Sequence, residues 1–540
     1  MKDRAYSIIF AAAAVMVVLV AAPYRIFDLD RFFVPKELVL HAAALCLALL
    51  GLARARALEA GRADLLLGLY LALSAVSAAL APDLWLSTRA LAVSLSGALV
   101  FWSVRSADGG TRRAIVAAAA AAAVIGAATS LLQAYGLHSD YFSLHRVPGG
   151  TLGNRNFMAH LSAICAPALL LVVLRARRGW AAAIGSAGLA VLAAALLLSR
   201  SRAALLGLSA AAVIMAYGLW RARAAADAVV ARRLKLLGIA AALGLAAALI
   251  IPNTLEWKSR SPYMDTVTGL ADYRKGSGHG RLVQYTRTLS LAASHPLLGV
   301  GPGNWTLVYP RSVDGFDPSI DYNTGRTMNP WPSSDWVAIL SERGLPALAV
   351  MLLFFGFMFA GAWRRAGRPA EGDDQLEGAA LAAVLAASGV VACFDALLLL
   401  PAPSLLVCGL AGALCAPSGF SVKLNVPRRA LYAALLLVWG AALLRSAGQI
   451  ASMSIYSKAR NKAQVSRAAL FDPGNARVRA RLDALNNKRR PAPPPPPADM
   501  SAPDDDAPGA EQPEPAMDEA APAEVSTAAP AAAVPAQPVP

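Results

Sequence analysis

The chain has 540 residues, of which 57% are hydrophobic and only 16% are charged, and its formal net charge is +16. Soluble proteins average roughly 45–50% apolar and about 25% charged residues. The apolar residues here collect in blocks of about 15 to 25, long enough to cross a hydrocarbon core about 30 Å thick. This composition excludes an ordinary soluble enzyme and predicts one polytopic membrane domain.

About 13 apolar stretches are candidate membrane spans, with bounds good to about 2–4 residues. They cover residues 7–22, 37–52, 65–81, 87–104, 114–135, 157–174, 180–198, 203–219, 236–251, 345–363, 377–400, 404–418 and 430–447. The stretch 404–418 is short and closely follows Pro401-Ala-Pro403, so a crossing, half of a broken hairpin and a re-entrant segment all remain open. The sequence therefore predicts an all-α polytopic membrane protein with about 12–13 transmembrane helices.

Basic residues are unevenly divided between the loops that join these stretches. With the N-terminus in the cytoplasm, about three times as many Lys and Arg fall in the inner short loops as in the outer ones. This bias predicts that orientation and an extracytoplasmic position for one large loop. Most of the positive charge then orients the chain, and we expect no nucleic-acid partner.

The pattern predicts a division of the chain into segments of different character. Residues 1–251 hold transmembrane helices 1–9, residues 252–343 the large periplasmic loop, and residues 344–447 transmembrane helices 10–13. Residues 448–490 are expected to form a helical hairpin, a single tetratricopeptide-like unit broken at Phe471-Asp-Pro-Gly-Asn475. Residues 491–540 are rich in Pro and Ala, acidic and predicted to be disordered, a composition that fits a protein-binding tail.

Arginines near the outer face are the first candidates for chemistry. Arg200 and Arg202 lie between two apolar stretches with almost no loop, and Arg281 begins a helical run within the large loop. Arg200 and Arg202 are either interfacial anchors or ligands for a phosphate or pyrophosphate, which a guanidinium binds through two hydrogen bonds. Arg281 at a helix start would lie where backbone N–H groups also favour an anion. Asp335, just before another helical run, is either a helix cap or a general base.

Four motifs in order resemble signatures of the O-antigen ligase and polymerase superfamily. They are Thr151-Leu-Gly-Asn-Arg-Asn-Phe-Met-Ala159, Ser199-Arg-Ser-Arg-Ala-Ala-Leu-Leu-Gly207, Gly280-Arg281 with His295-Pro-Leu-Leu-Gly-Val-Gly-Pro-Gly-Asn304, and Ser334-Asp-Trp-Val-Ala-Ile-Leu-Ser-Glu-Arg-Gly344. The resemblance covers roughly residues 20 to 445. It implies a GT-C-like multispan glycosyltransferase of the bacterial inner membrane, active at the periplasmic face.

The resemblance also implies substrates and residue roles. The donor would be a glycan on undecaprenyl pyrophosphate, and the acceptor lipid A core, another repeat unit or a protein hydroxyl. No metal or other cofactor is implied, because arginines stabilise the leaving pyrophosphate. Arg281 matches the loop arginine of the family and Arg200 or Arg202 the arginine between spans. The motifs place Asn154, Asn156, His279 and Asn304 among the expected substrate-binding residues.

One position departs from the family pattern. Where the family has a His thought to activate the acceptor, nine positions before Glu342, this chain has Ser333. A Ser hydroxyl does not accept a proton at neutral pH as an imidazole does. Four alternatives follow: Asp335 or the distant His279 replaces the base, the acceptor differs, or ligase activity has been lost.

Two other classes of protein compete with a glycan ligase. A flippase or exporter of a lipid-linked saccharide would also need many spans and buried arginines. It should show paired repeat halves and polar residues at mid-membrane, whereas here polar residues concentrate at one face and no clear repeat is present. A catalytically altered envelope scaffold would keep Arg281 while lacking the family His.

Overall fold

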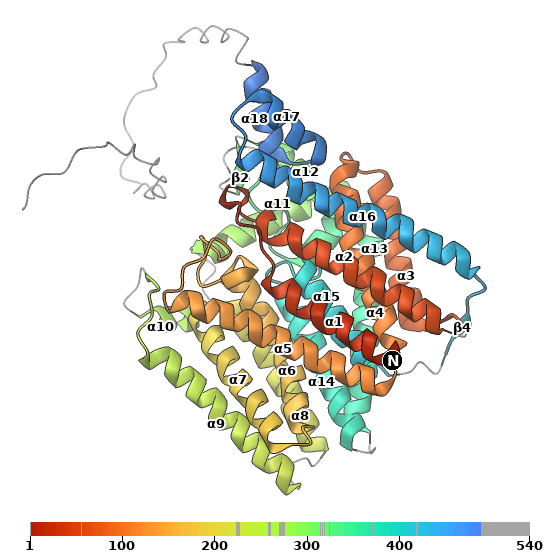
Figure 1. The fold of residues 1–540 in the computed structure, drawn as a ribbon, viewed down its shortest axis with the longest axis vertical. Coiled ribbons are helices and arrows are strands. Elements are labelled where there is room, and N and C mark those ends of the chain that lie inside the picture. Colours follow the sequence, from red (N-terminus) through yellow and green to blue (C-terminus); the bar gives the residue numbers. More distant parts are fainter. Residues whose placement is uncertain are drawn as a thin grey trace, which may run out of the picture. The chain divides into compact units, whose positions relative to one another are not determined.

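The computed structural model describes residues 2–487 except for 56, 223–226, 258–260, 269–275, 314, 316, 318, 323, 369–371 and 417–419. Within these residues the fold is helical, with two small two-stranded antiparallel sheets. The predicted all-α polytopic membrane fold is confirmed (Figure 1). The predicted disordered tail, residues 491–540, lies outside the described residues.

Among the described helices, eleven are long and apolar enough to cross a membrane, and two shorter apolar helices accompany them. The long helices are α2 (Asp30–Arg54), α3 (Arg62–Ala79), α4 (Leu84–Arg105), α5 (Gly109–Ala134), α6 (Arg155–Leu174), α7 (Gly179–Ser199), α8 (Arg202–Arg221), α9 (Ala228–Ile250), α13 (Asp335–Gly367), α14 (Gly372–Val391) and α16 (Arg428–Ser457). The shorter two are α1 (Lys2–Leu19) and α15 (Pro401–Leu414). Each predicted apolar stretch has a helix of its own.

The remaining elements lie between or after these helices. They are the 3₁₀ turns η1 (Arg25–Phe27), η2 (Gly150–Leu152) and η4 (Tyr309–Ser312), the short helices α10 (Pro262–Thr268), α11 (Gly276–Ser294) and α12 (Trp305–Val308), and the hairpin helices α17 (Lys462–Phe471) and α18 (Ala476–Asn487). The strands are β1 (Glu59–Ala60), β2 (Ile320–Asp321), β3 (Arg326–Thr327) and β4 (Val422–Lys423). Glu59 of β1 pairs with Lys423 of β4, and Ile320 of β2 with Thr327 of β3.

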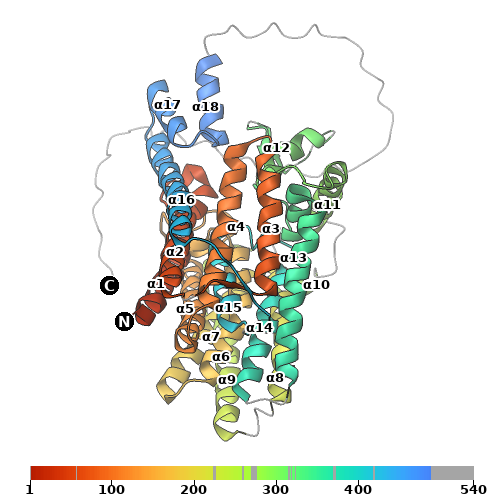
Figure 2. The same cartoon turned by 90° about the vertical axis from the view of Figure 1, so that its right-hand side faces the viewer.

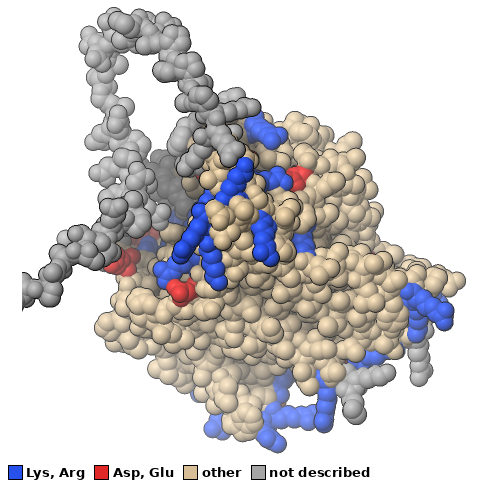
Figure 3. Space-filling model, turned by 45° about the horizontal axis from the view of Figure 1, so that its top comes forward, with Lys and Arg blue, Asp and Glu red and all other residues tan. Residues whose placement is uncertain are grey.

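The surface matches a chain embedded in lipid. On the face in Figure 3, Lys and Arg gather in one group in the upper part and in others along the lower and right edges, and the broad band between these groups shows neither charged colour. Large exposed side chains on the outer helices, such as Ile250, Leu437 and Leu444, are apolar. Exposed apolar surface on this scale suits a hydrocarbon solvent.

The segment that contains the short helix α15 reaches both ends of the bundle. Just before α15, the carboxylate of Asp335 accepts hydrogen bonds from the backbone N–H groups of Leu397 and Leu398, at 2.9 and 2.8 Å. At its end, Arg365 donates to the carbonyl of Leu414 at 2.6 Å. Asp335 and Arg365 stand near opposite ends of α13. The chain over 395–414 therefore runs the length of α13, although α15 alone spans only about 21 Å.

With α15 counted as a crossing, the C-terminal hairpin lies at the same end of the bundle as the large loop. Strand β4 lies beside β1 at one end, and α16 then runs to the other end, where Arg445 donates to Thr88 at 2.7 Å. Beyond α16, Arg326 of the loop donates to the carbonyl of Gly474 at 3.1 Å. Both views show α12, α17 and α18 at one end (Figures 1 and 2).

The hairpin is docked tightly through one glycine. A Cβ built on Gly474 would lie 1.9 Å from Cδ1 of Trp85, so any side chain there must push the hairpin away from α4. We expect Gly474→Ala to weaken this docking by about 1–3 kcal/mol, measured as faster proteolysis of α17 and α18. Gly440→Ala in α16 is the control, since nothing lies within 4 Å of its Cβ. Equal proteolysis of the two variants would contradict this packing.

The crossing by α15 predicts which residues share a side of the membrane. In a chain whose native cysteines are replaced by alanine, cysteines at Arg311 and Ala484 should react with an impermeant maleimide added from one side. A cysteine at Arg429, at the start of α16, should react only from the other side. Labelling of positions 429 and 484 from the same side would show that α15 is not a crossing.

Candidate arginine site

Four segments far apart in the sequence converge at the end of the bundle that carries the large loop. His160 of α6 lies with its Nε2 3.4 Å from Oγ of Ser201, in the turn between α7 and α8. The charges of Arg281 in α11 and of Asp395, after α14, both act on His160. The motifs containing Arg200, Arg202 and Arg281 therefore meet around one buried histidine.

Arg200 is held in an unusual backbone conformation. It ends α7 with φ 53° and ψ 27°, the left-handed region, which costs a residue with a side chain roughly 1–2 kcal/mol. Its Nε donates to Thr266 at 3.0 Å, and its guanidinium lies 4.9 Å from the ring centre of Trp257. Arg155 approaches the same ring at 5.8 Å. The tight turn between α7 and α8 thus directs Arg200 toward the large loop.

Positive charge accumulates at this place. Arg146 and Arg200 both act electrostatically on Arg155, and we call Arg146, Arg155, Arg200 and Arg281 the arginine site. Within the described part of the chain, none of the four forms an ion pair with a carboxylate, unlike Arg25, Arg89 and Arg365. Cations held close together without a counter-charge form a ready anion site.

The segment that carries Ser333 is bound to the same helix as Arg281. The backbone N–H of Ser333 donates to the side chain of Gln284 at 2.9 Å, and its carbonyl accepts from Tyr285. Gln284 and Tyr285 follow Arg281 by three and four residues, which places all three on one face of α11. The structure therefore brings Ser333 within about one helical turn, roughly 5 Å along the axis, of Arg281.

Asp335 has a structural role that the sequence did not indicate. The cap of α13 is Ser334, whose side chain accepts from the N–H of Val337 at 3.4 Å, so the expectation that Asp335 caps this helix is wrong. Asp335 is buried, and its Oδ2 instead holds the turn before α15. Its Oδ1 has no hydrogen-bond partner among the described residues.

The other expected substrate-binding residues are dispersed. Asn154 caps α6 by accepting from the N–H of Asn156 at 2.9 Å. His279 is exposed on α11, two residues before Arg281, and so does not share its face. Asn304 is fully buried and bonds Asp83 and Ser87 at the start of α4. Asn304 is thus occupied in fixing the large loop to the bundle.

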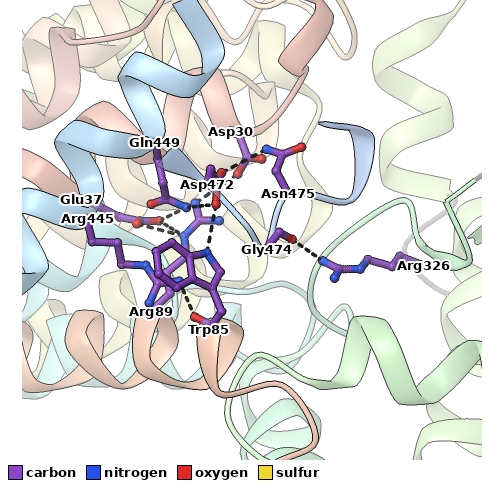
Figure 4. A network of polar contacts seen from close by, with 10 residues as sticks. All are labelled: Asp30, Glu37, Trp85, Arg89, Arg326, Arg445, Gln449, Asp472, Gly474 and Asn475. Atoms are coloured by element: carbon purple, nitrogen blue, oxygen red, sulfur yellow. Dashed lines mark hydrogen bonds and ion pairs between the residues drawn. The ribbon is translucent and has the colours of Figure 1, made fainter. Parts of the chain in front are cut away.

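A cavity of about 450 Å³ lies beside this site, and the sequence did not reveal it. Its walls come from η1 and the start of α2, from α4, α13 and α16, from several residues between Gly303 and Trp331, from Leu399 to Pro401 and from the turn between α17 and α18. Arg89 lines it and bonds both carboxylate oxygens of Glu37 and the carboxylate of Asp30, at 2.9 to 3.1 Å (Figure 4). The sequence carried one indication of this cavity, because Glu37 and Arg89 are charged residues inside two apolar stretches.

No group of His, Cys, Asp and Glu among the described residues is arranged to hold a metal ion. Residues 187–352 match the family model described as O-Antigen ligase. This segment is an O-antigen ligase superfamily domain. It contains Arg200, Arg202, Arg281, Asn304, Ser333 and Asp335. No curated protein matches the chain.

The O-antigen ligase domain also carries a charged cluster that shapes the large loop. Asp317 accepts from Tyr309 at 2.8 Å and pairs with Arg287 of α11. Burial alone raises the pKa of the Asp317 carboxyl, but hydrogen bonds from Ser319, Tyr309 and Arg287 outweigh it and hold the pKa below its usual range. Burial and the nearby carboxylate raise the pKa of Tyr309 to about 12.

This cluster predicts how the loop responds to acid. A carboxyl whose pKa is lowered in the folded state adds stability above its unfolded pKa and loses it as the pH falls through the folded pKa. Hydrogen exchange of amides over 305–327, corrected for intrinsic rates, should therefore speed up between pH 5 and about pH 3. Asp317→Asn should remove this step, and an unchanged step in the variant would contradict the assignment.

Proposed function

We propose that the protein transfers a glycan from undecaprenyl pyrophosphate to an acceptor at the periplasmic face of the bacterial inner membrane. The observation that carries this proposal is the arginine site, four cations that lack carboxylate partners within the described residues. It stands at the end of the bundle that also holds the large loop. The O-antigen ligase domain supplies two of these arginines, Arg200 and Arg281.

The chemistry of transfer explains why cations are needed there. An acceptor oxygen forms a bond to the anomeric carbon of the glycan while the bond from that carbon to the phosphate oxygen breaks. The electron pair leaves on the pyrophosphate, and the acceptor hydroxyl gives up a proton. Guanidinium groups placed in advance stabilise the charge that develops on the leaving pyrophosphate, with no metal required by the reaction.

The charge distribution supports the orientation. At the end opposite the arginine site, basic residues are abundant and several are paired, as in Arg105 with Asp64 and Arg175 with Glu377. Loops rich in Lys and Arg remain in the cytoplasm. The arginine site then faces the periplasm, where lipid-linked glycans of this kind are presented.

The chain departs from the family pattern at the residue expected to activate the acceptor as a base. Ser333 lies near Arg281 but has no basic group of its own. Asp335 is close in sequence, yet it is buried with one oxygen bonded to two backbone N–H groups. The Oδ1 of Asp335 has no hydrogen-bond partner among the described residues, and His279 faces away from Arg281. We therefore infer that Asp335 is a better candidate than His279 for the acceptor-activating base.

A transfer assay with a labelled undecaprenyl-pyrophosphate oligosaccharide tests these assignments. Arg281→Ala should lower the transfer rate by about 10²–10³-fold, because a stabiliser of the leaving group is lost. Arg281→Lys should restore only part of the rate, since an ammonium cannot make the paired hydrogen bonds. Arg311→Ala, an exposed loop arginine outside the site, is the matched control and should leave the rate unchanged.

The same assay separates the remaining alternatives. Asp335→Asn should abolish transfer while donor binding persists. His279→Gln should retain transfer. Full activity in Arg281→Ala would exclude the arginine site from catalysis. Binding of the donor by the wild type without transfer to any acceptor offered would point to the scaffold instead.

A further inference from the structure

The cavity of about 450 Å³ is lined by parts of the chain that lie far apart in sequence. The turn between α17 and α18 supplies one wall through Asp472, Gly474, Asn475, Ala476 and Arg477. The hairpin is fixed there by its own apolar cluster, in which Tyr456, Val465, Ala468 and Val478 pack against Phe27 and Val34. The hairpin is thus a built part of the cavity wall.

Hydrogen bonds hold this wall in place. The indole N–H of Trp85 donates to Asp472 at 3.0 Å, and Arg445 lies 4.0 Å from the centre of the Trp85 ring. Figure 4 shows this network joining α2, α4, α16 and the hairpin turn. A cavity with walls this firmly connected is preformed, which favours specific binding.

The lining has the opposite charge to the arginine site. It contains six acidic residues and three arginines. The acidic residues are Asp28, Asp30, Glu37, Asp321, Glu342 and Asp472, and the arginines are Arg89, Arg326 and Arg477. A phosphate or a uronic acid would meet net repulsion there. Trp331, packed edge-on against Phe33 at 5.2 Å, adds an aromatic surface to the lining.

One buried group in the lining lacks a partner. Gln449 is 2% exposed, and its side-chain oxygen has no hydrogen bond among the described residues, while its Nε2 contacts Asp472 at 3.4 Å. A buried amide oxygen left unpaired is costly unless something donates to it. A hydroxyl or an amine of a bound molecule is such a donor.

The cavity is joined to the proposed site of chemistry. Trp331 in its wall precedes Ser333 by two residues, and Leu399 and Leu400 in its wall follow the backbone that Asp335 binds. Phe33 and Trp331 also contact Phe157, two residues after Arg155. A molecule in the cavity would therefore lie beside the segment from Ser333 to Asp335.

We propose that this cavity binds the acceptor as an uncharged or amine-bearing saccharide and disfavours acidic glycans, with the α17–α18 turn as a specificity-determining wall. That the bound saccharide is the acceptor rests on the proposed transfer function. That the cavity binds a saccharide does not. The arginine site takes the anionic part of the donor, and the acidic cavity takes a sugar without negative charge.

Equilibrium dialysis of the full chain in detergent tests the binding. The probes are tetra-N-acetylchitotetraose, its deacetylated amine form and tetragalacturonate, which are of equal length and differ in charge. The neutral and amine forms should bind at least about tenfold more tightly than the acidic form. Equal binding of the three, or no binding of any, would overturn the proposal.

Two variants locate the site. Ala476→Trp should fill the cavity and weaken binding about tenfold or more, whereas Ala484→Trp, exposed on the same helix and outside the lining, should not. Asp28→Lys, an exposed lining position, should raise the relative affinity for tetragalacturonate about fivefold, and Asp483→Lys outside the lining should not. If neither lining variant differs from its control, the saccharide binds elsewhere and the proposal is wrong.

The two proposals fail in different ways. Arg281→Ala should lose transfer and keep saccharide binding, since Arg281 does not line the cavity. If the chain binds the saccharide but never transfers a glycan, the cavity remains a saccharide site and the transfer function is rejected. Transfer that is unchanged in Ala476→Trp would reject the cavity as the acceptor site while leaving the transfer function intact.

Discussion

A charged side chain inside a membrane bundle must find a partner, and this requirement organises the end of the bundle that carries the large loop. Fully buried Arg31 donates to the carbonyls of Asp140 and Phe142, and fully buried Lys36 to those of Val20 and Thr151. Through these bonds α2 fixes the segment that leads into α6, and with it Arg155 and His160. Each unsatisfied polar group in such an environment costs several kcal/mol. The four cations of the arginine site also have no carboxylate to balance them within the described residues, and they lie where an anionic ligand could supply the missing charge.

Charge separates the two halves of the proposed reaction. A pyrophosphate carries negative charge that grows as the bond to the sugar breaks, and the arginine site offers four positive groups on α6, α7, α11 and the segment before α6. The neighbouring cavity is acidic and would hold such a group poorly. Between them stand Ser333, which α11 holds by its backbone, and Asp335, which holds the turn before α15. Donor and acceptor would thus bind at two places that differ in charge.

Sequence patterns were sufficient for the helices and insufficient for the cavity, and the reason is physical. A run of apolar residues about 20 long has few alternatives to a spanning helix, since its backbone groups must be bonded within the segment. Of the arginine site, Arg200 and Arg281 were among the predicted candidates, because Arg200 interrupts apolar stretches with almost no loop and Arg281 lies at a helical run in the large loop, whereas Arg146 and Arg155 were not predicted. Contacts such as that of Trp85 with Asp472 join residues 387 apart and leave no trace in local periodicity. For the same reason Asn304 and Asp335 were expected near substrate, although their polar atoms are mostly occupied in tying α4 and α15 to distant segments.

The hairpin of α17 and α18 shows how a weak local signal acquires a definite role through tertiary packing. A single helical hairpin cannot bury its own apolar face, and here Phe27 and Val34 cover that face. Asp472, at the break between the two helices, is almost fully buried, and burial is the largest cause that raises the pKa of its carboxyl, followed by repulsion from Asp30. A carboxylate in that position does not drive docking by its charge, because its desolvation opposes the bonds from Trp85 and Asn475. Apolar burial and the close approach of Gly474 to Trp85 must hold the hairpin, and burial of the acidic group costs free energy. That cost is understandable if Asp472 contributes to the negative charge of the cavity that it lines.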